Sequence, residues 1–144
     1  SYALDGLFVG DMPQTGMALG ATVTPIDGLS VQALFNYYDK NYSDWSPNAR
    51  EVASDGTADR EQVWMAPSYS KLDVHISYDL PVGIAGTNMT AFAHIFNALD
   101  AIYVQDAVDH SQYNSYGDKV HAAHNAEVFF GTPRYFNAGL KVNF

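Results

Sequence analysis

Three ionisable side chains lie in two neighbouring segments of alternating apolar and polar residues, where they would suit acid–base chemistry. Asp73 and His75 fall in residues 71–80, and His94 falls in residues 89–95. A carboxylate beside an imidazole can act as a general acid–base pair. On adjacent strands that face water, the same residues simply line a wet surface, which is the favoured interpretation. The sequence has no G-x-S-x-G, no H-E-x-x-H and no phosphate loop, so we expect no enzyme.

Metal-ligating residues occur in the polar segments without the spacing of a known site. His121 and His124 have ligand-like spacing only on a helix, and a polar loop is their expected location. Oxygen ligands that suit calcium gather in two acidic groups without the regular spacing of an EF-hand: Asp39, Asn41 and Asp44, and Asp106 and Asp109. With no cysteine, a thiolate metal site is excluded. We therefore predict neither a metal nor a cofactor.

Composition limits the class of partner. The chain has 144 residues, of which 47% are hydrophobic, and its net charge is −9. A nucleic-acid partner is not expected, because the phosphate backbone demands clustered Lys and Arg. No apolar run approaches the roughly 18 residues that a membrane helix needs. If the chain spans a membrane, it does so as strands.

Five segments alternate apolar and polar side chains, the period of a β-strand. They are residues 17–24, 29–38, 71–80, 89–95 and 134–144. Short turns follow Thr24 and Leu80, whereas long polar segments cover residues 39–68 and 100–133. For the apolar sets of the first hairpin to share a face, its loop must hold three or five residues. Pairing about the second short turn predicts Asp73 opposite His94 and His75 opposite Phe92, with a bulge near Phe96.

The long polar segments decide between two kinds of β-protein. A connection of about thirty residues argues against a compact soluble domain. Outer-membrane barrels, in contrast, have short periplasmic turns, long extracellular loops and strands of about 9–11 residues. The predicted fold is all-β: the last five or so antiparallel strands of a large transmembrane β-barrel.

The last strand carries a second pattern. Its end resembles the terminal strand of bacterial outer-membrane barrels, whose assembly signal combines polar, glycine, apolar and aromatic positions. The four positions are filled here by Asn137, Gly139, Val142 and Phe144. This resemblance implies the barrel-assembly machinery as a partner.

The sequence as a whole resembles the TonB-dependent receptors of Bacteroidetes-type bacteria. The matching motifs are VGDMPQT (9–15), FNYYDKNY (35–42), PSYSKLD (67–73), FNALDAIY (96–103) and the terminal signal. The resemblance implies a bacterial outer-membrane location and import of a nutrient, such as a siderophore, vitamin, glycan or peptide. It also implies contact with outer-membrane lipid, and a surface lipoprotein is a further candidate partner.

The resemblance covers only the final strands of a barrel of about 22 strands around a plug. We therefore expect residues 1–144 to be a carboxy-terminal fragment of the receptor's barrel domain. The plug and the region that contacts the TonB complex would belong to the missing amino-terminal part. The physical chemistry of a bilayer leads to the same expectation. An open five-stranded sheet in lipid leaves two edges of unpaired backbone N–H and C=O groups, and each unpaired group costs several kcal/mol.

Ligand contacts are expected from aromatic and acidic residues of the long loops, because aromatic faces can stack on sugars. The candidates are Trp45, Trp64, Asp106, Asp109, Tyr113 and Tyr116. The alternative for each is that it packs the loop against itself.

Two other functions fit parts of the pattern. A secreted sugar-binding β-sandwich would use the same aromatic residues and the same alternation, but would bury its apolar faces. A small self-contained outer-membrane barrel, acting as an adhesin or structural protein, would need at least eight strands.

Overall fold

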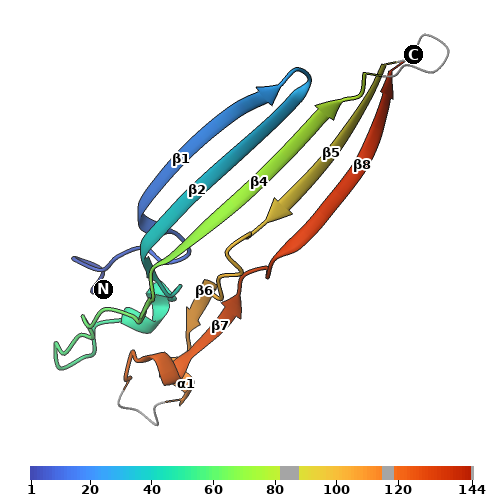
Figure 1. The fold of residues 1–144 in the computed structure, drawn as a ribbon. Helices are drawn as coiled ribbons and strands as arrows, with labels where there is room; N and C mark the ends of the chain where they lie inside the picture. The colour runs from blue at the N-terminus through green and yellow to red at the C-terminus, as the bar shows by residue number, and fades with distance from the viewer. Residues whose placement is uncertain (82–87, 115–118, 144) are drawn as a thin grey trace. The chain divides into compact units, whose positions relative to one another are not determined.

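The computed structural model describes residues 1–81, 88–114 and 119–143 (Figure 1). These residues fall into two compact units. The sheet unit consists of residues 17–37, 69–102 and 132–144, and the loop unit consists of residues 1–16, 38–68 and 103–131. Tyr116 and Phe144, two of the predicted site residues, lie outside the described residues.

One six-stranded sheet dominates the fold, and the all-β prediction is confirmed. Its main strands follow the order β1-β2-β4-β5-β8, and β3 pairs with the end of β2. Neither sheet formed by the described residues is closed, so the finer prediction of a transmembrane barrel is not shown. The strand bounds are β1 Pro13–Ile26, β2 Leu29–Tyr42, β3 Met65–Ala66, β4 Tyr69–Asp79, β5 Asn88–Phe96 and β8 Tyr135–Asn143.

A second, two-stranded sheet lies in the loop unit, within a segment expected to be a polar loop. Strand β6, Val104–Asp109, pairs antiparallel with β7, Ala126–Phe130, with an irregularity between Val104 and Asp106. Val104 and Ala107 of β6 join Ala66 in a small core, against which Trp64 and Val128 pack. Three short helices complete this unit: η1 Pro47–Arg50, α1 Ser111–Asn114 and η2 Ala123–Asn125.

The register between β4 and β5 corrects the sequence prediction. His75 lies opposite His94 and Ser77 lies opposite Phe92, so the predicted pairing was wrong by two residues. In the observed register Asp79 lies opposite Thr90, and Thr90 Oγ1 donates to Asp79 Oδ1 at 2.7 Å. Because side chains alternate with period two, this shift moves no side chain to the other face.

Two local predictions concern the strand ends. The strand bounds leave Asp27 and Gly28 between β1 and β2, fewer than the three or five residues predicted, but Gln32 donates to Thr22 across the hairpin, so the two polar sets do share a face. At the other end, β5 pairs regularly with β8 through Phe96, whereas its regular pairing with β4 ends at Ile95, and the Ala98 amide then donates to the Leu72 carbonyl. Asn97 ends the strand with a φ of 50°. It is buried, accepts the Ala101 amide and donates through Nδ2 to Ala101 and Thr132 carbonyls.

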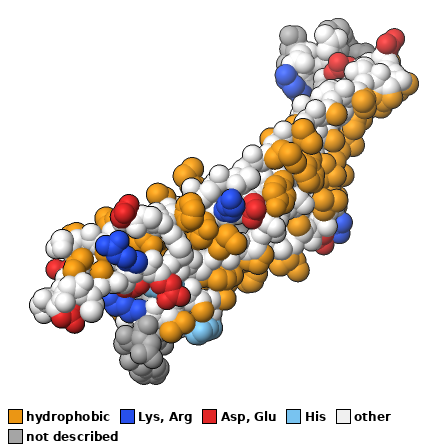
Figure 2. All heavy atoms as spheres, turned by 90° about the vertical axis from the view of Figure 1, so that its left-hand side faces the viewer, with side chains coloured by type: hydrophobic (Ala, Val, Ile, Leu, Met, Phe, Trp, Pro, Cys, Tyr) orange, Lys and Arg blue, Asp and Glu red, His pale blue; other side chains and the backbone are white. Residues whose placement is uncertain are grey.

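The sheet unit has an apolar face that lies exposed. On β5 and β8, apolar residues meet in register at four successive same-face positions: Met89 and Val142, Ala91 and Leu140, Ala93 and Ala138, and Ile95 and Phe136. Phe136 is 70% exposed and Leu140 is 62% exposed. Hydrophobic side chains gather along the sheet in Figure 2. Each fully buried hydrophobic side chain of the described residues belongs to the loop unit instead.

The opposite face of the sheet unit is more polar, with the Phe92 and Phe96 rings beside His94 and His75. Side chains from four strands line a shallow hollow of about 190 Å³ on this face. Gln32 Nε2 donates to Thr22 Oγ1 at 3.3 Å across β1 and β2. The lining residues are Thr22, Ser30, Gln32, His75, Ile76, Ser77 and His94. Among the described residues, no helix is long and apolar enough to cross a membrane.

Replacing Gly139 with alanine should destabilise the sheet. Gly139 lies opposite Phe92, and a Cβ at Gly139 would come within 2.6 Å of Phe92 Cζ. The ring would have to move from its packing against His94, so we expect a loss of about 1–3 kcal/mol of unfolding free energy. Urea unfolding measures this loss.

The matched control is Gly16→Ala in β1, where the nearest atom to the added methyl group is Tyr38 Cδ1 at 4.0 Å. Its unfolding midpoint should stay the same or rise slightly, since alanine restricts the unfolded chain. Equal midpoints for the two variants would show that Phe92 does not need the space at Gly139.

Candidate functional site

A hollow of about 510 Å³ opens in the loop unit between two chain segments. One wall comes from residues 44–49, which include the start of η1, and the other comes from residues 108–113, which join β6 to α1. Three of the predicted ligand-contacting residues line it: Trp45, Asp109 and Tyr113. The structure therefore brings together residues that are more than sixty positions apart in sequence.

The two aromatic residues of this hollow differ in their freedom. Trp45 donates its indole N–H to the Phe8 carbonyl at 2.9 Å, and the Arg50 guanidinium lies 5.5 Å from its ring centre. Tyr113 is 73% exposed, and its ring lies 6.0 Å from that of His110. The Trp45 side chain is thus held in place at one side of the hollow, whereas the Tyr113 ring is exposed to solvent.

Asp109 supports the hollow through its own chain. Its Oδ1 accepts the Ser111 amide at 3.2 Å, and its Oδ2 accepts the Ser111 hydroxyl at 2.9 Å. The same Oδ2 lies 2.8 Å from His121 Nδ1. Both carboxylate oxygens are committed to these partners, which suits a residue that shapes the loop more than one that binds a ligand.

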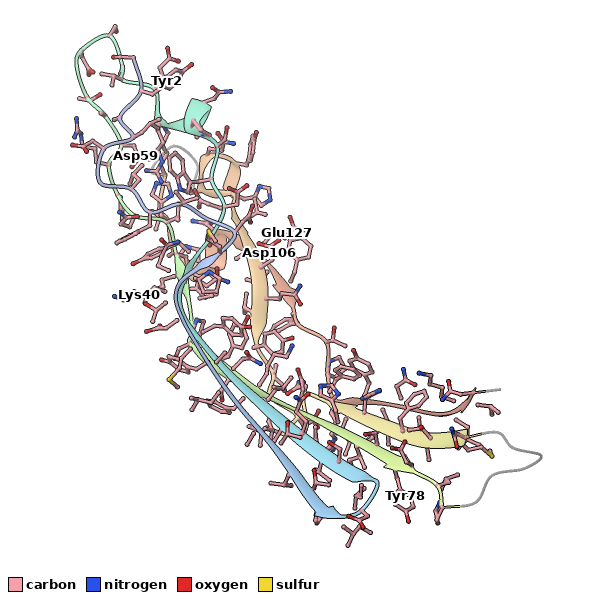
Figure 3. All side chains as sticks on the ribbon, turned by 90° about the horizontal axis from the view of Figure 1, so that it is seen from above. Tyr2, Lys40, Asp59, Tyr78, Asp106 and Glu127 are labelled. Atoms are coloured by element: carbon pink, nitrogen blue, oxygen red, sulfur yellow. The ribbon has the colours of Figure 1, made fainter. Side chains whose placement is uncertain are left out.

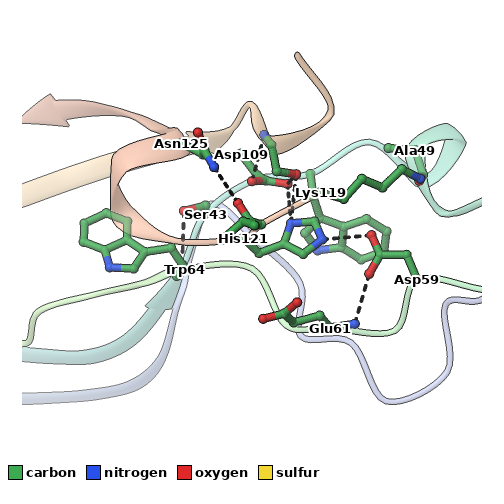
Figure 4. A network of polar contacts seen from close by, with 12 residues as sticks. Ser43, Ala49, Asp59, Glu61, Trp64, Asp109, Lys119, His121 and Asn125 are labelled. Carbon is green, nitrogen blue, oxygen red and sulfur yellow. Dashed lines mark hydrogen bonds and ion pairs between the residues drawn. The ribbon is translucent and has the colours of Figure 1, made fainter. Parts of the chain in front are cut away.

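A buried polar network continues from Asp109 through the loop unit (Figure 4). His121 Nε2 lies 2.8 Å from Asp59 Oδ2, and Asp59 Oδ1 lies 2.7 Å from the Arg50 guanidinium. Arg50 is only 1% exposed and also donates to the Glu61 carbonyl at 2.9 Å. The network ties three stretches of chain together, around residues 50–61, 109–111 and 121.

The network contains serine, histidine and aspartate within hydrogen-bonding distance, a combination used in nucleophilic catalysis. Ser111, however, is only 2% exposed, and its hydroxyl donates to Asp109. A nucleophile must reach a substrate, and this hydroxyl is enclosed by its own loop. The arrangement therefore fits a structural clamp.

Electrostatics favour the charged form of Asp59. Burial raises the pKa of Asp59, but hydrogen bonds from His121 and from the Glu61 amide, together with the Arg50 charge, outweigh it. The pKa of Asp59 therefore lies below its ordinary value of 3.8.

Asp106 lies on β6, as Figure 3 shows, and does not line the hollow. It interacts with Asp11, and Asp11 also feels the charge of Asp44, which lines the hollow. Partial burial, a hydrogen bond with Asp106 and the charges of Asp44 and Asp106 raise the pKa of Asp11. Within the described part of the chain, no group of three or more His, Cys, Asp or Glu side chains is arranged to hold a metal ion.

The remaining predicted residues lie elsewhere. Trp64 packs against the small core of the loop unit, and its carbonyl accepts the Ser43 amide and hydroxyl. In β8, Asn137 and Gly139 lie opposite His94 and Phe92, whereas Val142 lies on the apolar face.

Sequence reasoning missed Arg50 and Asp59 and left His121 as a loop residue. Their partners are between 9 and 62 positions away along the chain. No local period connects them, so only their shared burial reveals the network.

Comparison with protein-family models, with curated proteins and with solved structures finds no match to this chain. The function must therefore be inferred from the two faces of the sheet and from the hollow of the loop unit.

Replacing Asp59 with asparagine should destabilise the loop unit by about 3 kcal/mol, because it leaves the buried Arg50 charge without its partner. The two tryptophans, Trp45 and Trp64, both lie in this unit, so their fluorescence during urea unfolding reports on it. As a control, Asp5→Asn changes an exposed carboxylate of the same unit and should leave the unfolding midpoint nearly unchanged.

The same variant predicts a change in pH dependence. Because the pKa of Asp59 is depressed in the folded state, its contribution is fully present above the unfolded value and is lost as the pH falls through the folded one. The parent chain should therefore lose this stability below about pH 3.8, and Asp59→Asn should lack that loss. Parallel curves for the two proteins across this range would contradict the assignment.

Proposed function

We propose that this chain supplies wall strands and extracellular loops of a TonB-dependent outer-membrane transporter that imports a nutrient. The observation that carries the proposal is the sheet unit, which exposes an apolar face opposite a polar one. A wall between lipid and a watery interior requires this arrangement.

The exposed apolar face is unfavourable in water. Fully burying a large apolar side chain contributes about 1.5–3 kcal/mol, and soluble monomers rarely expose a large contiguous apolar patch. Hydrocarbon would cover this face without any further protein layer. The strand lengths also suit a bilayer, since β4 has 11 residues and β8 has 9, against the roughly 9–11 needed.

The open edges of the sheet support a larger assembly. In the order β1-β2-β4-β5-β8, each outer strand has one neighbour. In hydrocarbon the unpaired N–H and C=O groups of these edges would cost several kcal/mol each. Further strands on both sides would satisfy them, as in a complete receptor barrel that also holds the plug and contacts the TonB complex.

In this proposal the loop unit faces the outside and its hollow contacts the cargo. Tyr113 presents an open aromatic surface, and Trp45 forms a fixed wall beside it. The cargo class remains a siderophore, vitamin, glycan or peptide.

A secreted sugar-binding domain is the second candidate, because an aromatic-lined hollow also suits a glycan. It requires a second apolar layer over the exposed sheet face. Solubility without detergent separates this candidate from the transporter.

The test is to fractionate the cells that make this protein and to identify the polypeptide by denaturing gel and peptide mapping. We expect its peptides in the outer-membrane fraction, extracted only by detergent, within a polypeptide several times heavier than 15.8 kDa. A 15.8 kDa protein that stays soluble without detergent would contradict the proposal and favour the secreted domain.

A further inference from the structure

Two histidines on neighbouring strands meet on the polar face of the sheet unit. His75 of β4 lies directly opposite His94 of β5. Their Nδ1 atoms are 2.8 Å apart, at the edge of the 190 Å³ hollow that both rings line. At this distance one ring donates its proton to the lone pair of the other, so a single proton holds the pair together.

The same geometry is close to that of a two-histidine metal site. Imidazole nitrogens bind first-row divalent metals at about 2.0–2.1 Å, which places two nitrogens of one site roughly 3 Å apart. For a metal ion to replace the shared proton, the two nitrogens must separate by a few tenths of an ångström and the rings must turn so that both lone pairs converge on the ion.

Neighbouring aromatic rings hold the two imidazoles in place. The edge of Phe96 packs against His75 at 5.5 Å, and Phe92 packs against His94 at 5.4 Å between ring centres. Phe92 itself lies over Gly139, where a methyl group would not fit. Ligands that are positioned before the metal arrives bind it more tightly, because less conformational freedom is lost.

The hollow supplies further oxygen atoms and space for water. Hydroxyl and amide side chains of Thr22, Ser30, Gln32 and Ser77 line it. Imidazole with neutral oxygen ligands suits copper, nickel and zinc, whereas calcium and magnesium prefer carboxylates and carbonyls. The net charge of −9 also favours the approach of cations.

We propose that His75 and His94 form a binding site for a divalent transition-metal ion, with Cu²⁺ bound most tightly. Two protein nitrogens hold the ion, and water completes its coordination in the hollow. The site does not depend on the transport proposal, since it follows from the register of β4 and β5 alone. It departs from the sequence-based expectation of no metal, which rested on the lack of cysteine and of any known metal-site spacing.

Calorimetric titration of the purified full chain in mild detergent with Cu²⁺ tests this site. We expect one equivalent to bind the parent chain, and His75→Gln and His94→Gln each to weaken binding about 10- to 100-fold or more. The matched control is His124→Gln, an exposed histidine of η2, which should bind like the parent chain. Unchanged affinity in either pair variant would overturn the proposal.

Electron paramagnetic resonance of the parent chain gives a second test that requires no variant to fold. The Cu²⁺ spectrum should show coupling to two imidazole nitrogens. A spectrum with one imidazole or none, or a parent chain that does not bind Cu²⁺ in the titration, would overturn the site.

Discussion

The structure depends on one constraint: the exposed apolar face of the sheet unit is unfavourable in water and requires an apolar medium to cover it. Alternation puts Phe136 and Leu140 on one side of β8, and both remain largely exposed. The buried hydrophobic residues of the described chain lie in the loop unit, three of them in one small cluster, so the sheet does not depend on a core of its own. A surrounding hydrocarbon phase would supply what a second protein layer supplies in a sandwich.

The polar face depends on the same alternation but adds register. The step from His75 to Ser77 keeps both side chains on one face, and pairing with β5 then decides which partner each one meets. Because His75 meets His94, the polar face carries two facing imidazoles instead of a carboxylate beside an imidazole. Gly139 leaves room for the Phe92 ring that packs against His94.

Much of the sheet was predictable, because alternation is a local signal. The pattern of residues 71–80 predicts β4, and that of residues 134–144 predicts β8. Register was not predictable, since a shift of two residues preserves the alternation and only contacts such as Thr90 with Asp79 fix it. The loop unit was predicted least well: Arg50 and His121 find Asp59 through folding of long polar segments that carry no period.

We propose that the apolar face of the sheet unit contacts lipid. The chain has no cysteine, so Leu140→Cys and Lys141→Cys each introduce one labelling site on opposite faces of β8. The measurement is quenching of an attached fluorophore by brominated lipids in reconstituted bilayers. The account predicts strong quenching at position 140 and weak quenching at position 141; equal, weak quenching at both would contradict it.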